Sequence, residues 1–190
     1  MPNFGLMLHA GGGIPTGFIP GEFGPHAGIW MGISMSDRFD GLWGLDYYTL
    51  PSNLMTVSQS NYSGPLKSIQ VQPTDDVAFS VNVRWYLADK WDYVHHTYNT
   101  VPYLLVGIGM DAVVDEYPRD NKPFWDAGYD LLFATNLGAG MDFPMDEGRS
   151  WSIYAEGLDH FIYWQGLTQV LTTHIGVRFM LDSAHVDPFR

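Results

Sequence analysis

The sequence has no cysteine, few basic residues and no long apolar run. Without cysteine, neither disulfides nor thiolate chemistry are possible. Lys and Arg number 9 against 21 Asp and Glu, which gives a formal net charge of −12. This balance argues against nucleic-acid binding and against polybasic attachment to anionic lipid. No uncharged apolar run reaches the length of about 18 residues that a transmembrane helix requires.

No secretory signal peptide is visible in this sequence, where residues 1–2 lead directly into a strand-like segment. If the protein is secreted, we expect Met1 to be an added start on a mature sequence from which the signal peptide was removed.

Apolar and polar residues alternate with period two in eight segments of the chain. The pattern is clearest in residues 77–87 and 171–181, and it recurs in residues 4–11, 27–35, 43–48, 103–111, 130–141 and 151–156. Such alternation predicts β-strands with one apolar and one polar side. Hydrophobic residues make up 46%, charged residues 16%, and the mean hydropathy is −0.08. An average of this kind is expected when a lipid-facing surface is combined with a polar lumen.

The connections between these segments alternate in length. Those at 36–41 and 143–149 are short, whereas those at 15–25, 51–76 and 115–128 are long and rich in turn residues. Short turns at one end and long loops at the other are typical of up-and-down membrane barrels. The connection at 89–100 is long for a turn, and the one at 164–168 is short for a loop. At 157–159 the alternation blurs, and we expect a β-bulge there.

The sequence therefore predicts an all-β fold, an eight-stranded antiparallel up-and-down transmembrane β-barrel. A single barrel domain is expected over residues 1–182, followed by a periplasmic C-terminal tail over residues 183–190. Outward aromatics near the strand ends are expected to form interfacial girdles: Trp43, Trp85, Trp151 and Phe179 at the turn end, Phe161 and Tyr163 at the loop end.

Six motifs carry a resemblance to a known family. They are GLMLHAGGG (5–13), LWGLDYY (42–48), VNVRWY (81–86), PYLLVGIG (102–109), LGAGMD (137–142) and GVRF (176–179). In these the chain resembles the OmpA/opacity-type outer-membrane barrel superfamily over nearly its whole length. The resemblance implies a bacterial outer-membrane location, in contact with lipid and lipopolysaccharide, with both termini and the short turns in the periplasm. Such barrels usually end on an aromatic residue, whereas here residues 183–190 follow the last strand.

Several ionisable residues fall on the inward side of the expected strands: His9, Asp46, Arg84, Asp111, Glu156, His174 and Arg178. Counting from the turns places Asp46 and Arg84 at similar depth, Glu156 diagonal to His174 and Arg178, and His9 close to His174 across the closing seam. A salt-bridged plug is the preferred interpretation, because buried charges must be paired. A narrow gated polar path is the alternative. A catalytic or metal site is the least favoured interpretation: the two histidines and the glutamate could bind a divalent ion, but no spacing motif supports it, so we expect no metal and no cofactor.

A lipid-modifying barrel enzyme is the least favoured function, and no enzyme is expected. Asp159 and His160 could supply an orienting group and a base for acyl transfer, but no serine lies two residues beyond that histidine, and Ser152 lies at the opposite end of its strand. The pair His95–His96 lies in the long turn, where a solvated dipeptide is favoured over a ligand pair.

Two functions from different classes remain. The first is a structural, anchoring or adhesin-like barrel that binds another envelope protein or a host surface through its loops or outer wall. The second is a small channel. Exposed aromatics are candidates for loop contacts: Phe18, Phe23, Tyr62, Tyr117, Phe124 and Trp125.

Overall fold

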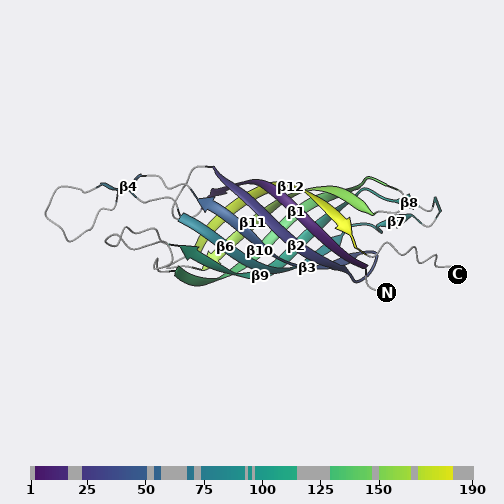
Figure 1. Ribbon diagram of the computed structural model, residues 1–190, viewed down its shortest axis with the longest axis horizontal. Coiled ribbons are helices and arrows are strands. Elements are labelled where there is room, and N and C mark those ends of the chain that lie inside the picture. The colour runs from purple at the N-terminus through teal and green to yellow at the C-terminus, as the bar shows by residue number, and fades with distance from the viewer. Residues whose placement is uncertain are drawn as a thin grey trace.

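Eight long strands form a closed barrel in the described part of the computed structural model. They are β1 (Asn3–Pro15), β2 (Gly24–Ser34), β3 (Phe39–Leu50), β6 (Thr74–Tyr86), β9 (Val101–Val114), β10 (Tyr129–Pro144), β11 (Trp151–Tyr163) and β12 (Leu167–Met180). The structure describes residues 3–16, 23–50, 54–56, 68–70, 74–92, 94–95, 97–114, 129–146, 150–163 and 167–181. Every neighbouring pair is antiparallel, and β12 pairs with β1 to close the barrel (Figure 1). The predicted fold is confirmed.

Two short hairpins extend the ends of the barrel. β4 (Leu54–Thr56) pairs with β5 (Ser68–Gln70), and β7 (Trp91–Asp92) pairs with β8 (Thr97–Tyr98). The start of β1, the end of β12 and the β7–β8 hairpin lie at one end, called the turn end here (Figure 1). β4 lies beyond the opposite end, called the loop end. No helix in the described residues is long and apolar enough to cross a membrane.

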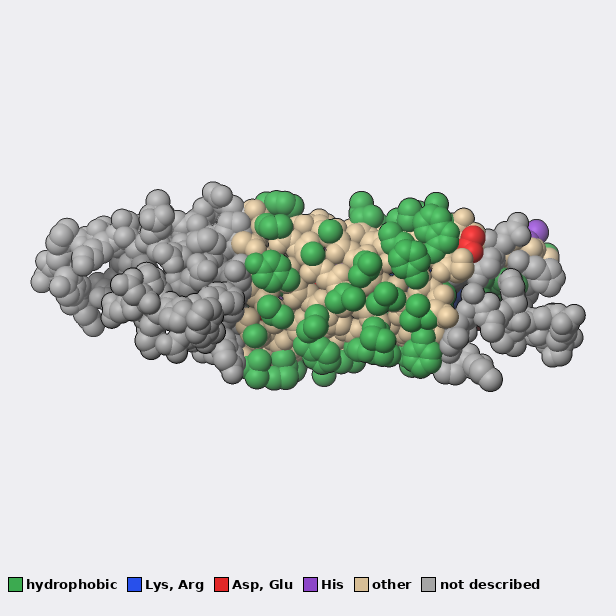
Figure 2. All heavy atoms as spheres, in the orientation of Figure 1, with side chains coloured by type: hydrophobic (Ala, Val, Ile, Leu, Met, Phe, Trp, Pro, Cys, Tyr) green, Lys and Arg blue, Asp and Glu red, His purple; other side chains and the backbone are tan. Residues whose placement is uncertain are grey.

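The alternation in the sequence sorts side chains to the two faces of the wall. In β6 the side chains of Val77, Phe79, Val81, Val83 and Trp85 are exposed, whereas Ala78, Ser80, Asn82, Arg84 and Tyr86 are buried. A strand turns successive side chains to opposite faces, so the apolar set faces outward around the barrel. Figure 2 shows hydrophobic side chains across the visible face of the wall, with acidic side chains only at its edge.

The centre of the lumen holds a hydrophobic cluster, called the mid-barrel cluster here. Its members are almost fully buried: Met7, Trp30, Leu42, Leu105, Tyr154 and Leu158. Gly44 makes room for the indole of Trp30, because a Cβ there would lie 2.0 Å from Trp30 Cδ1 and 2.5 Å from Ile29 O. An eight-stranded barrel has space for packed side chains and little more.

The bulge expected at 157–159 is wrong. Strand β11 pairs residue by residue with both neighbours, and Gly157 lies opposite Ala139 on one side and Thr173 on the other. The alternation blurred in the sequence because Leu158 is an apolar residue on the inward side, where it joins the mid-barrel cluster. The alternation therefore continues to the loop end of the strand, with the side chains of His160 and Ile162 on the inward side.

The long turn at 89–100 folds back on the barrel end. Lys90 N donates to Asp37 O at 3.2 Å, and Tyr86 N donates to Arg38 O at 2.8 Å. Arg38 Nε also forms an exposed ion pair with Asp89 Oδ1 at 2.7 Å. The turn is long because it contains the β7–β8 hairpin and packs against the turn between β2 and β3.

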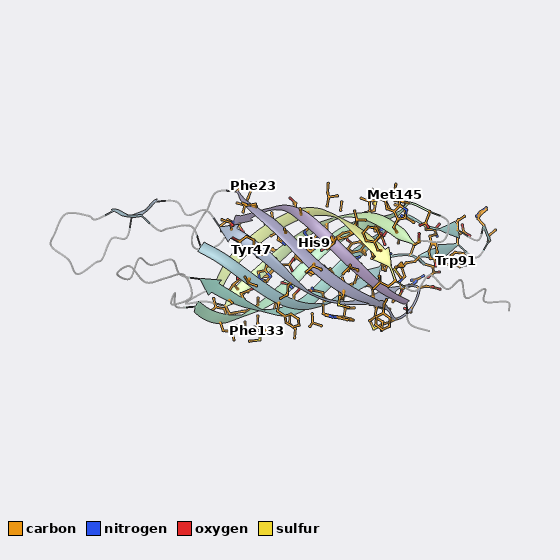
Figure 3. All side chains as sticks on the ribbon, in the orientation of Figure 1. His9, Phe23, Tyr47, Trp91, Phe133 and Met145 are labelled. Atoms are coloured by element: carbon orange, nitrogen blue, oxygen red, sulfur yellow. The ribbon has the colours of Figure 1, made fainter. Side chains whose placement is uncertain are left out.

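Outward aromatics lie along the wall, and Figure 3 labels two of them, Tyr47 and Phe133, near the loop end. At the turn end Trp151 lies opposite Phe179, and Trp85 stacks on Phe39 with ring centroids 6.4 Å apart. At the loop end Tyr163 lies 5.7 Å from Phe133. Trp43 and Phe161 are half-buried, and Trp43 lies opposite Val81, four residues deeper than Trp85. That these residues form interfacial girdles stays a prediction. The expected tail at 183–190 lies outside the described residues.

Candidate functional site

A network of paired charges lies in the turn-end part of the lumen. Lys90 Nζ lies 2.6 Å from Asp40 Oδ1, and Arg178 Nη1 lies 3.1 Å from Asp40 Oδ2. Arg178 Nη2 reaches Asp142 Oδ2 at 2.6 Å. Tyr86 OH donates to Asp40 Oδ2 at 3.0 Å, and its ring lies 4.8 Å from the Lys90 ammonium. Lys90 comes from the long turn, so this turn contributes a side chain to the network.

A buried ion pair crosses the middle of the lumen. Arg84 Nη2 on β6 donates to Glu156 Oε2 on β11 at 3.0 Å, and both side chains are fully buried. Tyr103 OH donates to the same oxygen at 2.8 Å, and the Arg84 guanidinium lies 4.1 Å from the Tyr103 ring centroid. This pair lies among the aromatic side chains of the mid-barrel cluster, since Tyr154 is 5.2 Å from the same guanidinium.

Three histidines meet beside Asp46 on the loop-end side of that pair, and we call them the histidine cluster. The Nε2 atoms of His9 and His26 lie 2.7 Å and 3.0 Å from Asp46 Oδ1. Trp30 Nε1 donates to Asp46 Oδ2 at 2.8 Å and so fixes the carboxylate. His174 on β12 stacks on His9 of β1 across the seam, with ring centroids 4.3 Å apart. Figure 3 labels His9 in the central part of the barrel.

A second cluster, called the acidic cluster here, lies closer to the loop end. His160 Nε2 is 3.0 Å from both carboxylate oxygens of Asp111, and its Nδ1 bonds Asn136. Asp76 is buried beside them, and one ligand atom each of Asp76, Asp111 and His160 lie within 4.8 Å of one another. Tyr48 separates the two clusters, because its ring lies 4.3 Å from His26 and 5.8 Å from His160.

Two of the three expected neighbour relations in the lumen are wrong. Asp46 and Arg84 differ in depth, since Asp46 lies opposite Ala78 and Arg84 lies opposite Asp40. Glu156 lies directly opposite His174, not diagonal to it. Arg178 forms its ion pairs elsewhere, at the turn end. Residue counting from turns failed because the strands of a tilted barrel are staggered. The expected approach of His9 and His174 across the seam is present.

Sequence reasoning missed six inward residues of the network: His26, Asp40, Asp76, Lys90, Asp142 and His160. Four of them continue the period-two pattern just beyond the predicted strand limits, so longer strands would have included them. His160 was lost through the expected bulge. Lys90 lies in a turn, where no periodicity marks it as inward.

The pair that sequence analysis considered for acyl transfer is separated by the barrel wall. His160 is buried in the lumen, whereas Asp159 is on the outward side and accepts a hydrogen bond from Gln169 Nε2 at 2.6 Å. Asp159 therefore cannot orient His160. Ser152 is fully buried at the turn end. His95 is exposed and lies 2.8 Å from Asp92, while His96 lies outside the described residues.

The outer wall has one notable hollow of about 600 Å³ in its described part. Small outward residues of β1, β11 and β12 form its floor, among them Ala10, Gly12, Gly157 and Thr173. Phe23, which is 63% exposed, lies against Gly12. The other candidates for loop contacts, Phe18, Tyr62, Tyr117, Phe124 and Trp125, lie outside the described residues.

A closed antiparallel barrel with an apolar outer surface and ionisable groups in its interior is suited to span a lipid bilayer. In a bilayer every backbone polar group must be bonded within the protein, and a closed barrel achieves this without an open edge. The protein has the fold of an eight-stranded membrane β-barrel. Comparison with solved structures finds the same fold in outer-membrane barrels.

The chain is similar in structure to Neisserial surface protein A (NspA), with a TM-score of 0.62 and 10% identity over 93% of this chain and 96% of that one. It also resembles the N-terminal β-barrel domain of Pseudomonas aeruginosa OprF, with a TM-score of 0.52 and 12% identity over 92% and 97%. A third similar structure is Ail of Yersinia pestis in complex with the heparin analogue sucrose octasulfate, with a TM-score of 0.49 and 10% identity over 95% and 97%. No family model matches the sequence, and no curated protein matches it.

Proposed function

We propose that this barrel is closed to solutes and acts as an anchoring or partner-binding protein through its loops or its outer wall. The observation that carries the proposal is the filling of the lumen at successive depths. The Asp40–Lys90–Arg178 network lies at the turn end, the mid-barrel cluster with the Arg84–Glu156 pair lies in the centre, and the two histidine-containing clusters follow toward the loop end.

The charges in the centre and at the turn end support closure because each has an opposite charge within bonding distance. A buried ion pair is costly to break, since removing one partner leaves an uncompensated charge worth about 3–5 kcal/mol. A conducting path would have to separate Arg84 from Glu156 and displace Trp30, Tyr103 and Tyr154, all of which are almost fully buried. Activity would then have to come from the outside of the barrel.

Planar-bilayer recording tests the closed lumen. We expect no steady conductance from the purified protein at neutral pH, over a voltage range in which a matched porin conducts. Glu156→Gln should remain silent, because the aromatic side chains still fill the centre. Steady conductance of the unaltered chain, increased by Glu156→Gln, would instead support the alternative of a narrow gated channel and overturn the proposal.

Photo-crosslinking in intact cells tests the partner. A photoreactive residue is placed at Thr173 in the wall hollow, at Tyr62 in a predicted loop, and at Val81 on the wall as a control. Small residues let another membrane segment approach closely, so an outer-wall partner should crosslink at Thr173 more than at Val81. A loop partner should crosslink at Tyr62. Equal or absent crosslinking at all three positions contradicts partner binding.

A further inference from the structure

Charge is distributed unevenly along the lumen. The described inward cations, Arg84, Lys90 and Arg178, all lie in the centre or at the turn end. The loop-end half contains three buried carboxylates, Asp46, Asp76 and Asp111, and no Lys or Arg among its described residues. Histidines are the groups that face these carboxylates. A carboxylate buried without a cation is costly, so this half of the lumen has a high affinity for positive charge.

The histidine cluster has the composition and spacing of a metal site. His9, His26 and His174 each offer a ring nitrogen, and these nitrogens lie within 4.8 Å of one another. They come from three strands, β1, β2 and β12, so the wall of the barrel brings them together. Neutral imidazole nitrogens are preferred ligands of zinc and related first-row ions, and three histidines with one open position form a known type of zinc site.

Unpartnered nitrogen atoms point to a ligand. His174 and His26 are 3% and 2% exposed, yet Nδ1 of each has no hydrogen-bond partner among the described residues. Nε2 of His174 lies 3.2 Å from Glu156 Oε1 but outside hydrogen-bonding geometry. Buried polar atoms in native proteins nearly always have a partner. Two buried imidazoles with unused nitrogens in one cluster are therefore an exception that a bound cation explains.

The surrounding residues support such a cation. His9 Nδ1 lies 3.0 Å from Tyr154 OH, whose oxygen can accept a hydrogen bond from Nδ1–H when Nε2 binds a metal. Trp30 holds Asp46 so that Oδ1 lies beside two of the histidines. Metal-binding histidines characteristically bond an outer partner through the second ring nitrogen. The negative charge of Asp46 also compensates part of a divalent charge.

We propose that His9, His26 and His174 bind a divalent first-row transition ion of the zinc class inside the lumen, with Asp46 as the adjacent countercharge. The site goes beyond the proposed anchoring function and does not depend on it. Sequence reasoning expected no metal because its candidate ligands, two inward histidines and a glutamate, follow no spacing motif, and because His26 was missing from its inward set. The barrel closure supplies the proximity that a short motif supplies in other zinc sites.

Zinc binding to the tag-free full chain tests the site. The protein is folded in detergent after treatment with a chelator, equilibrated with Zn²⁺ by dialysis and assayed for bound metal. We expect about one equivalent per chain, held by a nitrogen-rich shell with Zn–N distances of about 2.0–2.1 Å in X-ray absorption. Binding of no zinc at micromolar concentrations, or an oxygen-rich shell, overturns the proposal without any variant.

Variants then assign the ligands. His174→Gln and His26→Gln should each weaken Zn²⁺ binding by more than about 100-fold, and Tyr154→Phe by about 10-fold or more, since even outer partners contribute that much. His95→Gln, in the exposed turn, is the matched control and should bind as the unaltered chain does. Folding of each variant is checked by its heat-modifiable migration in gels. Unchanged binding in folded His174→Gln and His26→Gln, or loss only in Asp111→Asn, places the metal elsewhere and overturns the proposal.

Discussion

Neutralising Glu156 should destabilise the barrel, because the buried Arg84 guanidinium then has no countercharge beside it. Glu156 Oε2 accepts hydrogen bonds from Arg84 and Tyr103. In Glu156→Gln an amide oxygen can still accept the Tyr103 bond, so the main loss is the countercharge of Arg84. Other contacts of that guanidinium are Met7 Sδ at 3.8 Å and the faces of two tyrosine rings. Breaking a buried pair costs about 3–5 kcal/mol, and we expect Glu156→Gln to lower the free energy of unfolding by about 3 kcal/mol.

The second half of the experiment removes the unpaired charge. Arg84→Met alone should also destabilise the barrel, because it leaves the buried Glu156 carboxylate without the guanidinium that lies 3.0 Å from it. The double variant Arg84→Met with Glu156→Gln should recover most of the loss, giving a coupling energy of about 2–3 kcal/mol. A double variant no more stable than Glu156→Gln would show that packing, not charge, dominates the centre.

Urea unfolding in lipid vesicles, followed by tryptophan fluorescence and by heat-modifiable migration, measures these free energies. The exposed pair Arg38–Asp89, with side chains 51% and 48% exposed, supplies the control. Arg38→Gln should leave the midpoint unchanged because surface ion pairs are screened by water. A shift in that control equal to the shift in Glu156→Gln would refute the argument from burial.

Three other changes test the wall, the histidine cluster and the turn. Val81→Arg, in the middle of the outward face of β6, should cost about 2–4 kcal/mol in the same vesicle assay. Val94→Arg in the exposed turn should have no effect, and equal effects of the two changes would mean that the facing assignment is wrong. Gly28→Ala should destabilise the barrel and weaken zinc binding, because a Cβ there would lie 2.2 Å from a carboxylate oxygen and 2.4 Å from a ring nitrogen of the cluster; unchanged zinc affinity would contradict this geometry. A side-chain hydrogen bond from His95, with backbone bonds, lowers the pKa of Asp92, so the turn gains stability above the ordinary Asp pKa and loses it as pH falls through the lowered value. His95→Ala should raise the pKa of Asp92 in an NMR titration, and an unchanged value would exclude that bond.

The wall of the barrel could be predicted from sequence because its determinant is local. From Phe79 to Trp85 each residue of β6 differs in polarity from its neighbours, and the period-two pattern alone separates Val81 and Val83 from Asn82 and Arg84. The lipid outside and the filled lumen inside impose the same requirement on every strand. Eight strands and their facing therefore follow from the pattern without knowledge of tertiary contacts.

The lumen network could not be predicted to the same extent because it depends on stagger. Which carboxylate meets Arg84 is decided by the relative depth of strands that are up to half a barrel apart, and Glu156 on β11 is 72 residues away in the chain. Strand limits were also set too short, so Asp40 and Asp142 were left out of the inward set. His160 was excluded because an inward leucine before it resembled a break in the pattern.

The contacts of Arg178 determine when the barrel can become stable. This residue lies on the last strand, and the two carboxylates that it binds lie on β3 and β10. The stack of His174 on His9 likewise joins the last strand to the first. Neighbouring hairpins can form early, since their contacts are local. The interior contacts of β12 form only when all eight strands are present and β12 has paired with β1. Assembly is therefore expected to end in one cooperative step, and a chain lacking its last strand should remain an open sheet that is quickly degraded.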